Sequence, residues 1–313
     1  MRRFCLCIIT IAFLSENLYS QSPSESIVTL SRNLVEPYVE PLITGFGTAL
    51  GSGLYTSANP HRLFGFDIGI KAMYVPFPPS SKYYNVIVSL YEEQDDSFVV
   101  RDTLIPNAPT IIGPDTTIEI DTSGGRVAVP SQLPHGFEKS ALYFGIPQLS
   151  VGLPFSTEVL LRYMTVPLEG DRISIFGWGL KYNLNRGPLS LFPISLSLQF
   201  VNQSLRLGSL LKSTTTSLNI HASKGILFLT IYTGVGLEWT NVKLTYDYTY
   251  KRPDPDTGEL EEVTESIELK FSGKNKQRFV IGAAFNFFLL RFNVDYNIGK
   301  YNAVSLGLGI SFL

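Results

Sequence analysis

Three segments of the sequence carry opposite charges four residues apart, and their six side chains are the first candidates for a functional site. The pairs are Asp67/Lys71, Glu158/Arg162 and Arg291/Asp295. In a β-strand this spacing places both side chains on one face, about 13 Å apart. Because the other face of each segment is apolar, we expect all six to point into a polar interior. There they could line a translocation path or ligand site, or they could brace and fill a narrow barrel through cross-strand pairs, which is the interpretation we favour.

The three histidines offer little for catalysis. His221 shares a predicted strand face with Ser217, Asn219 and Ser223, a set of residue types found in outer-membrane lipases. A catalytic triad depends on geometry, and no nucleophile motif surrounds this cluster, so we interpret His221 as a polar luminal residue. His61 and His135 fall in predicted outer loops.

Metal and phosphate sites are not expected. Residues 254–259 lack the regular oxygen ligands of a calcium loop, and no Gly-rich phosphate loop is present. We therefore expect neither a cofactor nor a metal, and no catalytic residue.

The elements that would position these side chains are strands, because apolar and polar residues alternate from residue 64 to the end of the chain. The polar face carries Gly, Ser, Thr and Asn with isolated charges. Several of the alternating stretches are longer than the about 5–6 residues of a usual strand in a soluble protein. A transmembrane barrel strand needs about 9–11 residues, apolar toward lipid and polar toward the lumen. The pattern predicts an all-β, transmembrane, antiparallel up-and-down β-barrel. A soluble β-sandwich is the alternative.

The predicted barrel covers residues 45–313 and has about twelve strands. If both ends of the chain lie in the periplasm, the number of strands must be even. We expect strands near residues 46–56, 64–75, 84–91, 140–152, 155–166, 171–184, 189–203, 213–222, 226–250, 264–287, 289–297 and 302–312. Fourteen strands result if the tall hairpin 226–287 is really four strands.

Within that hairpin, the alternating apolar residues of 264–287 all fall on odd-numbered positions. In the partner strand they change from odd-numbered to even-numbered positions between Trp239 and Val242. A change of parity inside one strand predicts a β-bulge there. Residues 92–138 and 251–263 are predicted to be long extracellular loops, and the first of them has room for a small hairpin.

The start of the chain predicts export. Arg2 and Arg3 precede the apolar residues 4–14, and small Ser20 follows a more polar stretch. This is typical of a signal peptide, residues 1–20, cleaved near Ser20. Both cysteines, Cys5 and Cys7, lie inside it, which excludes thiol catalysis and a disulfide scaffold in the mature chain.

Residues 21–44 are the only segment predicted to be helical. Ile27, Leu30 and Leu34 have helical spacing, and Pro37 and Pro41 are expected to end the helix. Because the segment precedes the first strand, we expect it to start in the periplasm and to plug the barrel mouth.

Composition agrees with a membrane barrel. The chain is 44% hydrophobic with a formal charge of −2, and no basic cluster offers the phosphate contacts of a nucleic-acid-binding protein. No apolar run after residue 21 reaches the about 18–20 residues of a spanning helix. Aromatic residues near predicted strand ends are typical of the girdles at membrane interfaces; they are Trp178, Tyr182, Phe192, Phe200, Trp239, Phe287, Tyr296 and Phe312.

Several short motifs resemble known outer-membrane proteins. Residues 45–58 (GFGTALGSGLYTSA), 65–68 (GFDI) and 177–182 (GWGLKY) resemble an uncharacterised family of bacterial outer-membrane barrels. Residues 307–312 (GLGISF) look like the C-terminal strand that the barrel assembly machinery reads, although Leu313 follows the aromatic residue. More distantly, residues 21–44 are similar to the plug of the long-chain fatty acid and aromatic hydrocarbon transporters.

These observations together predict a barrel in the outer membrane of a Gram-negative bacterium that passes or binds a small hydrophobic molecule, in the manner of a porin. The alternative is a structural or partner-docking barrel with a closed lumen, and an outer-membrane hydrolase is a distant third. Expected partners are outer-membrane lipid, the barrel assembly machinery and possible hydrophobic ligands, but not nucleic acid.

Overall fold

The computed structural model describes residues 23–94, 97–116, 118–119, 126–127, 132–133, 135–168, 171–185, 193–253 and 260–312. The expected signal peptide lies outside these residues. The chain divides into two compact units. A barrel unit comprises Ile43–Phe77, Ser140–Lys243 and Phe271–Leu313, and a second unit comprises Met1–Leu42, Pro78–Lys139 and Leu244–Lys270.

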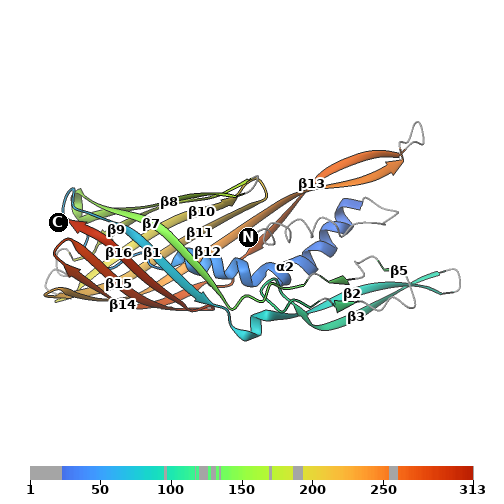
Figure 1. The fold of residues 1–313 in the computed structure, drawn as a ribbon, viewed down its shortest axis with the longest axis horizontal. Coiled ribbons are helices and arrows are strands. Elements are labelled where there is room, and N and C mark those ends of the chain that lie inside the picture. Colours follow the sequence, from blue (N-terminus) through green and yellow to red (C-terminus); the bar gives the residue numbers. More distant parts are fainter. Residues whose placement is uncertain are drawn as a thin grey trace. The chain divides into compact units, whose positions relative to one another are not determined.

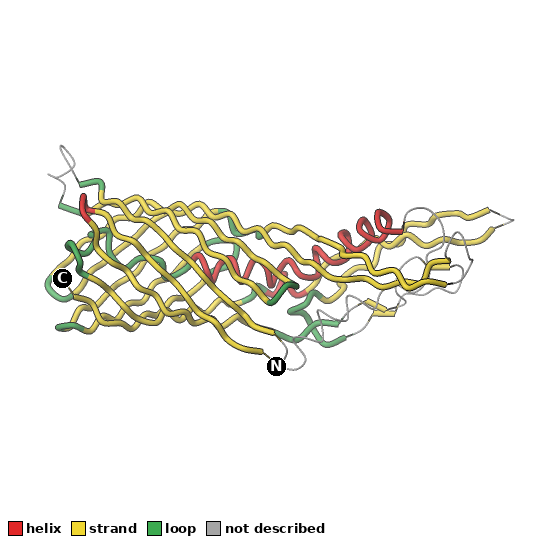
Figure 2. Tube along the Cα trace, turned by 90° about the horizontal axis from the view of Figure 1, so that it is seen from above, coloured by secondary structure: helices red, strands yellow, loops and turns green. Residues whose placement is uncertain are grey.

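Ten strands form a closed barrel in the described part of the chain, with neighbouring strands antiparallel in every register that the structure defines (Figure 1). They are β1 (Phe66–Pro76), β7 (Ala141–Leu153), β8 (Thr157–Leu168), β9 (Asp171–Asn183), β10 (Ser195–Leu207), β11 (Leu211–Ile226), β12 (Leu229–Pro253), β14 (Gln277–Phe287), β15 (Leu290–Ile298) and β16 (Ala303–Phe312). β1 pairs with β16, and β11 pairs with β12, so the sheet has no free edge between these strands. Figure 2 shows the strands crossing the barrel obliquely.

The predicted number of twelve strands is wrong, and so is the alternative of fourteen. Residues 46–56 are the end of a helix and a following loop rather than a first strand. Residues 84–91 do form a strand, β2 (Tyr83–Gln94), but it pairs with β3 (Ser97–Pro109) in a separate sheet. The small-residue pattern of residues 45–53 suits close helix packing as well as a strand, and periodicity alone did not separate the two.

Helix α2 (Pro23–Gly51) continues through Pro37 and Pro41, which were expected to end it. Each proline removes one backbone N–H from the helical ladder, but its φ remains helical. The predicted apolar stripe at Ile27, Leu30 and Leu34 lies outside the described side chains. Among the described residues, no helix is both long and apolar enough to cross a membrane.

The irregularity in the tall hairpin lies on the strand opposite the predicted one. Burial alternates without interruption along residues 231–241 of β12, so the predicted bulge there is wrong. Two backbone hydrogen bonds locate the extra residue: Glu238 N–H donates to Lys276 O, and Gly273 N–H donates to Thr240 O. Between these two bonds, β12 advances by two residues, from 238 to 240, whereas the opposite strand spans three, from 273 to 276. The partner therefore carries the extra residue, between β13 (Leu260–Ser272) and β14.

This bulge explains why the apolar parity was misleading. Phe271, before the bulge, is buried, whereas Phe279, after it, points outward with 43% exposure. The extra residue shifts the alternation, so that positions of one parity point inward before the bulge and outward after it. At the same place, the apolar residues change from the inward face to the outward face. The two changes cancel in the sequence, which leaves one continuous parity.

The outer surface of the barrel is apolar, as the alternation predicted. On paired strands β1 and β16, Ile70 and Leu306 are 60% and 55% exposed, whereas Lys71 and Ser305 are buried. The aromatic residues expected at strand ends also point outward; those described are Trp178, Tyr182, Phe200, Trp239, Phe287, Tyr296 and Phe312. Phe192 lies outside the described residues.

The second unit has its own small core. The second unit includes the start of α2, strands β2 and β3, the 3₁₀ helix η2 (Pro79–Lys82) and the two-residue strands β4 (Ile118–Glu119), β5 (Arg126–Val127) and β6 (Gln132–Leu133). Tyr38 is buried, donates a hydrogen bond to the carbonyl of His135 and accepts one from the N–H of Ile111 through its own carbonyl. The region 92–138, expected as a long loop, thus contains most of a paired hairpin, β2 and β3.

The outward apolar face generates a mutational prediction. Leu306→Arg should impair assembly, because a charge at the lipid-facing midplane of a barrel costs about 2–4 kcal/mol, whereas Leu306→Phe should be tolerated. The readout is the fraction of protein that migrates faster unheated than boiled on a gel. Equal assembly of both variants would show that this face does not contact lipid.

Candidate functional site

The barrel interior contains a part of the same chain, residues 43–61, which we call the luminal segment. Near its start, Thr44 Oγ1 accepts a hydrogen bond from the N–H of Lys274. At its end, the ring of His61 lies 3.3 Å from Ser311 Oγ of β16. The segment therefore enters the lumen at the end opposite the C-terminal strand end. Residues 21–44 were expected to start in the periplasm, at the same barrel end as the C-terminus, whereas the last residue of that stretch, Thr44, lies at the opposite barrel end.

Arg162 on β8 holds the centre of the luminal segment. Its side chain is fully buried, and all five N–H donors are used. Nη1 donates to Leu50 O at 2.8 Å, and Nη2 donates to Ser52 O and Gly53 O, both at 2.9 Å. The remaining bonds go to the side-chain oxygens of Gln148 (2.8 Å) and Gln203 (3.1 Å).

These bonds cap the end of α2. The last carbonyls of a helix have no partner within the helix, and a cation there also interacts favourably with the helix dipole. Gln203 adds a second bond to Leu50 O, at 2.8 Å. A planar five-donor guanidinium matches this set of converging acceptors, and an ammonium group does not.

Ala58 is the second attachment point of the segment. Its carbonyl accepts hydrogen bonds from Ser197 Oγ on β10 (2.5 Å) and Asn183 Nδ2 on β9 (3.1 Å), and its N–H donates to Ser223 Oγ on β11 (2.8 Å). Further up the lumen, Gln199 Nε2 donates to Leu54 O at 3.2 Å. Three adjacent strands therefore bind the backbone of the segment directly.

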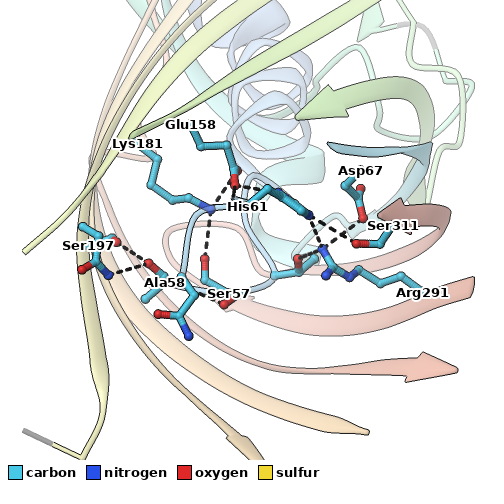
Figure 3. A network of polar contacts seen from close by, with 12 residues as sticks. Ser57, Ala58, His61, Asp67, Glu158, Lys181, Ser197, Arg291 and Ser311 are labelled. Atoms are coloured by element: carbon cyan, nitrogen blue, oxygen red, sulfur yellow. Dashed lines mark hydrogen bonds and ion pairs between the residues drawn. The ribbon is translucent and has the colours of Figure 1, made fainter. Parts of the chain in front are cut away.

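Glu158 is the centre of the third attachment (Figure 3). Its carboxylate lies 2.7 Å from Lys181 Nζ and accepts a bond from the His61 backbone N–H at 3.0 Å. His61 Nδ1 is 2.8 Å from the same carboxylate, and Lys181 also donates to Ser57 O. His61, expected in an outer loop, is thus part of the lumen. His135 lies in the second unit, where it contacts Asp115 at 2.9 Å.

All six charged residues predicted to face the lumen do so, and most of their interactions join different strands or join a strand to the luminal segment. Arg291 pairs with Asp67 at 3.0 Å, and Lys71 donates to Asn293 Oδ1 at 2.6 Å. Asp295 accepts bonds from Tyr232 Oη and Asn297 Nδ2, at 3.1 and 2.6 Å. This arrangement favours the bracing interpretation over an open polar path.

Sequence reasoning missed three charged residues and one helix contact. Lys181 was not singled out, and neither was the buried ion pair between Glu238 and Arg278, at 3.3 Å. Gly51 of α2 lies so close to this pair that a Cβ atom there would overlap Glu238 Oε2. Gly47 and Gly51, four residues apart on one helix face, were the available signal of close packing.

The space left among the charged groups is small. A cavity of about 10 Å³ is lined by residues that include Asp67, Glu158, Lys181 and Arg291. That volume corresponds to about one water molecule. Among the described residues, no group of side chains has the composition to hold a metal ion.

The chain belongs to DUF6588, a family of unknown function, whose family model matches residues 1–312. This confirms the expected resemblance to an uncharacterised family. A search of curated proteins finds none that matches the chain.

Two solved structures are similar to parts of the chain. OmpTdeltaL8, a loop L8 deletion mutant of an outer membrane protein of Vibrio cholerae, is 8% identical over 79% of this chain and 98% of that chain, with a TM-score of 0.27. The outer membrane channel DcaP of Acinetobacter baumannii is 13% identical over 80% and 96%, with a TM-score of 0.20. Such low TM-scores carry no weight for fold or function.

The role of Arg162 can be tested by its most conservative replacement. Arg162→Lys should destabilise the luminal segment, since at least one buried carbonyl loses its donor at a cost of about 1–3 kcal/mol. We expect a lower temperature for the transition from fast to slow gel migration. Arg206→Lys, at an exposed position on β10, is the matched control. Identical transition temperatures would mean that Arg162 does not hold the segment.

Proposed function

We propose that this DUF6588 protein is an outer-membrane β-barrel, closed at rest by its own luminal segment, that anchors the second unit at the membrane for docking a partner. The observation that carries the closed lumen is the saturation of Arg162 by three backbone carbonyls of the segment and two glutamine side chains. A lumen built in this way is a packed interior rather than an open channel.

The membrane location is supported by the outer surface. Large apolar side chains point outward on strand after strand, for example Ile70, Leu308 and Phe279, each more than 40% exposed. A continuous apolar surface of this kind would associate or aggregate in water, whereas lipid would cover it. A closed sheet also leaves no unpaired strand edge, which a bilayer requires.

A role other than catalysis is supported by His221. Its ring is buried and stacks on Tyr55, with centroids 3.9 Å apart and planes 8° apart. The hydroxyl and amide groups near it in sequence, Ser217 and Asn219, lie on the same strand. This geometry provides no exposed nucleophile beside a base.

A second function, the gated passage of a small hydrophobic molecule, is favoured by one observation. Leu54 and Tyr55 of the luminal segment pack in a buried cluster with wall residues that include Leu160, Val201 and Val280. If the segment moved, these wall residues would become an apolar lining. On this proposal the segment is a plug, and the hydrophobic solute replaces Leu54.

Cell fractionation and planar bilayers test the closed anchor. The full chain should fractionate with outer membranes, show heat-modifiable migration and conduct no measurable current. Recovery as a soluble periplasmic protein would contradict the membrane location. A steady current through the unmodified barrel would contradict the closed lumen.

A deletion tests which residues close the barrel. Removing residues 22–36 should leave conductance unchanged, because Arg162 still binds Leu50, Ser52 and Gly53. Leu54→Ala combined with Arg162→Ala should allow the segment to move and should raise conductance or the uptake of hydrophobic solutes. If the deletion alone opens the barrel, the plug lies nearer the N-terminus than proposed here.

A further inference from the structure

Basic side chains gather at one end of the barrel, the end opposite the C-terminal end of β16. The strands that carry or flank them are neighbours in the sheet, in the order β9, β10, β11, β12, β14 and β15. All of these side chains are exposed. We call the group the basic arc; its members are Arg172 on β9, Arg206 on β10, Lys212 on β11, Lys274 and Lys276 before β14, and Lys300 after β15.

Acidic side chains do not balance this charge on the outer surface. Among the described residues of the barrel unit, Asp171 is the only exposed carboxylate, and it accepts a hydrogen bond from the N–H of Arg172 at 2.8 Å. The other described carboxylates of this unit are buried; they are Asp67, Glu158, Glu238 and Asp295. The described surface at this end of the barrel therefore carries a positive charge.

Like charges are brought close together within the basic arc. Arg206 lies directly opposite Lys212 in the register of β10 and β11. The backbone N–H of Lys300 donates to Asn275 Oδ1 at 2.7 Å, which places Lys300 beside the connection that carries Lys274 and Lys276. Like charges directly opposite each other on paired strands are destabilising. An anion bound among these side chains would relieve the repulsion.

The basic arc borders the apolar outer surface of the barrel. Phe176 follows Arg172 by four residues on the same face of β9 and is 51% exposed. Ile298 precedes Lys300 by two residues and is 44% exposed. Long basic side chains can lie along apolar surface while their charged ends reach polar surroundings. An anion held here sits directly beside an apolar wall, which is the arrangement that a lipid headgroup and its acyl chains require.

The lengths of the connections indicate which leaflet this is. At the C-terminal end of β16, three of the connections between barrel strands have three residues or fewer: β7 to β8, β11 to β12 and β14 to β15. The long connection of residues 77–140 joins β1 to β7 at the end of the basic arc. In outer-membrane barrels the short turns are periplasmic and the long loops extracellular. The basic arc therefore belongs at the outer leaflet.

We propose that the basic arc binds the anionic, phosphate-bearing headgroups of lipids in the outer leaflet. This inference rests on the membrane location proposed above and adds the class of lipid that surrounds one end of the barrel. Each basic group near an anionic bilayer surface adds an attraction that falls off within a Debye length, so several of them along one rim select anionic over zwitterionic lipid.

Lipid selection by the full chain tests the proposal. The protein is reconstituted into vesicles of phosphatidylglycerol and phosphatidylcholine in equal parts and extracted in mild detergent, and the lipids that remain bound are quantified. Arg206→Gln combined with Lys212→Gln is compared with Arg62→Gln combined with Lys224→Gln, which removes two exposed basic residues outside the arc. Arg206→Lys combined with Lys212→Arg keeps the charge. Heat-modifiable migration shows that each variant is assembled.

We expect the unmodified protein to retain phosphatidylglycerol over phosphatidylcholine by about fivefold. The arc variant should lose most of this enrichment, whereas the control and the charge-keeping variant should retain it. Sodium chloride should weaken the enrichment, because exposed charges are screened by salt.

Three results would overturn the lipid site: no enrichment by the unmodified protein, enrichment unchanged in the arc variant, or an equal loss in the control. A specific loss with inorganic phosphate, beyond that with sodium chloride of equal ionic strength, would identify a site for soluble anions instead and would also overturn it. Failure of the full chain to insert into vesicles would contradict the membrane location itself. The two failures are therefore distinguishable.

Discussion

A buried guanidinium without a carboxylate partner is the constraint on which the rest of the barrel depends. Arg162 can remain charged at the centre of the lumen only because five oxygens surround it, three of them from the backbone of the luminal segment. The dependence is mutual, since the carbonyls of Ser52 and Gly53 at the end of the helix accept from Arg162, and the carbonyl of Leu50 would otherwise keep only its bond from Gln203. Barrel and segment must therefore assemble together, and removing either side of this contact leaves unpaired polar groups in the interior.

The other luminal charges extend the same principle to the barrel end near β16. Glu158 joins β8 to β9 through Lys181 and to the segment through His61, and Arg291 joins β15 to β1 through Asp67. Because these interactions cross strands, they resist both widening of the barrel and withdrawal of the segment.

The helix that enters the lumen is shaped by its small residues. Gly51 lets α2 approach Glu238 and Arg278 more closely than any side chain would allow, and Thr48 and Ser52 bond back to helix carbonyls instead of requiring partners on the wall. A bulkier sequence in residues 43–53 could not share this interior with ten inward-facing strand surfaces.

The sequence by itself indicated the segments that form the ten barrel strands, with residues 46–56 and 84–91 wrongly added, and it indicated that six named charges lie inside, because period-two alternation is a local property. It did not separate the strand of residues 46–56 from the end of a helix, since small residues suit both, and it placed the bulge on β12 because reversals of facing and of chemistry cancelled near Gly273. Nor did it show that Arg162 binds carbonyls rather than Glu158, or that His61 reaches Glu158. Those pairings depend on which strands become neighbours once the sheet closes around residues 43–61, and only the tertiary structure decides that.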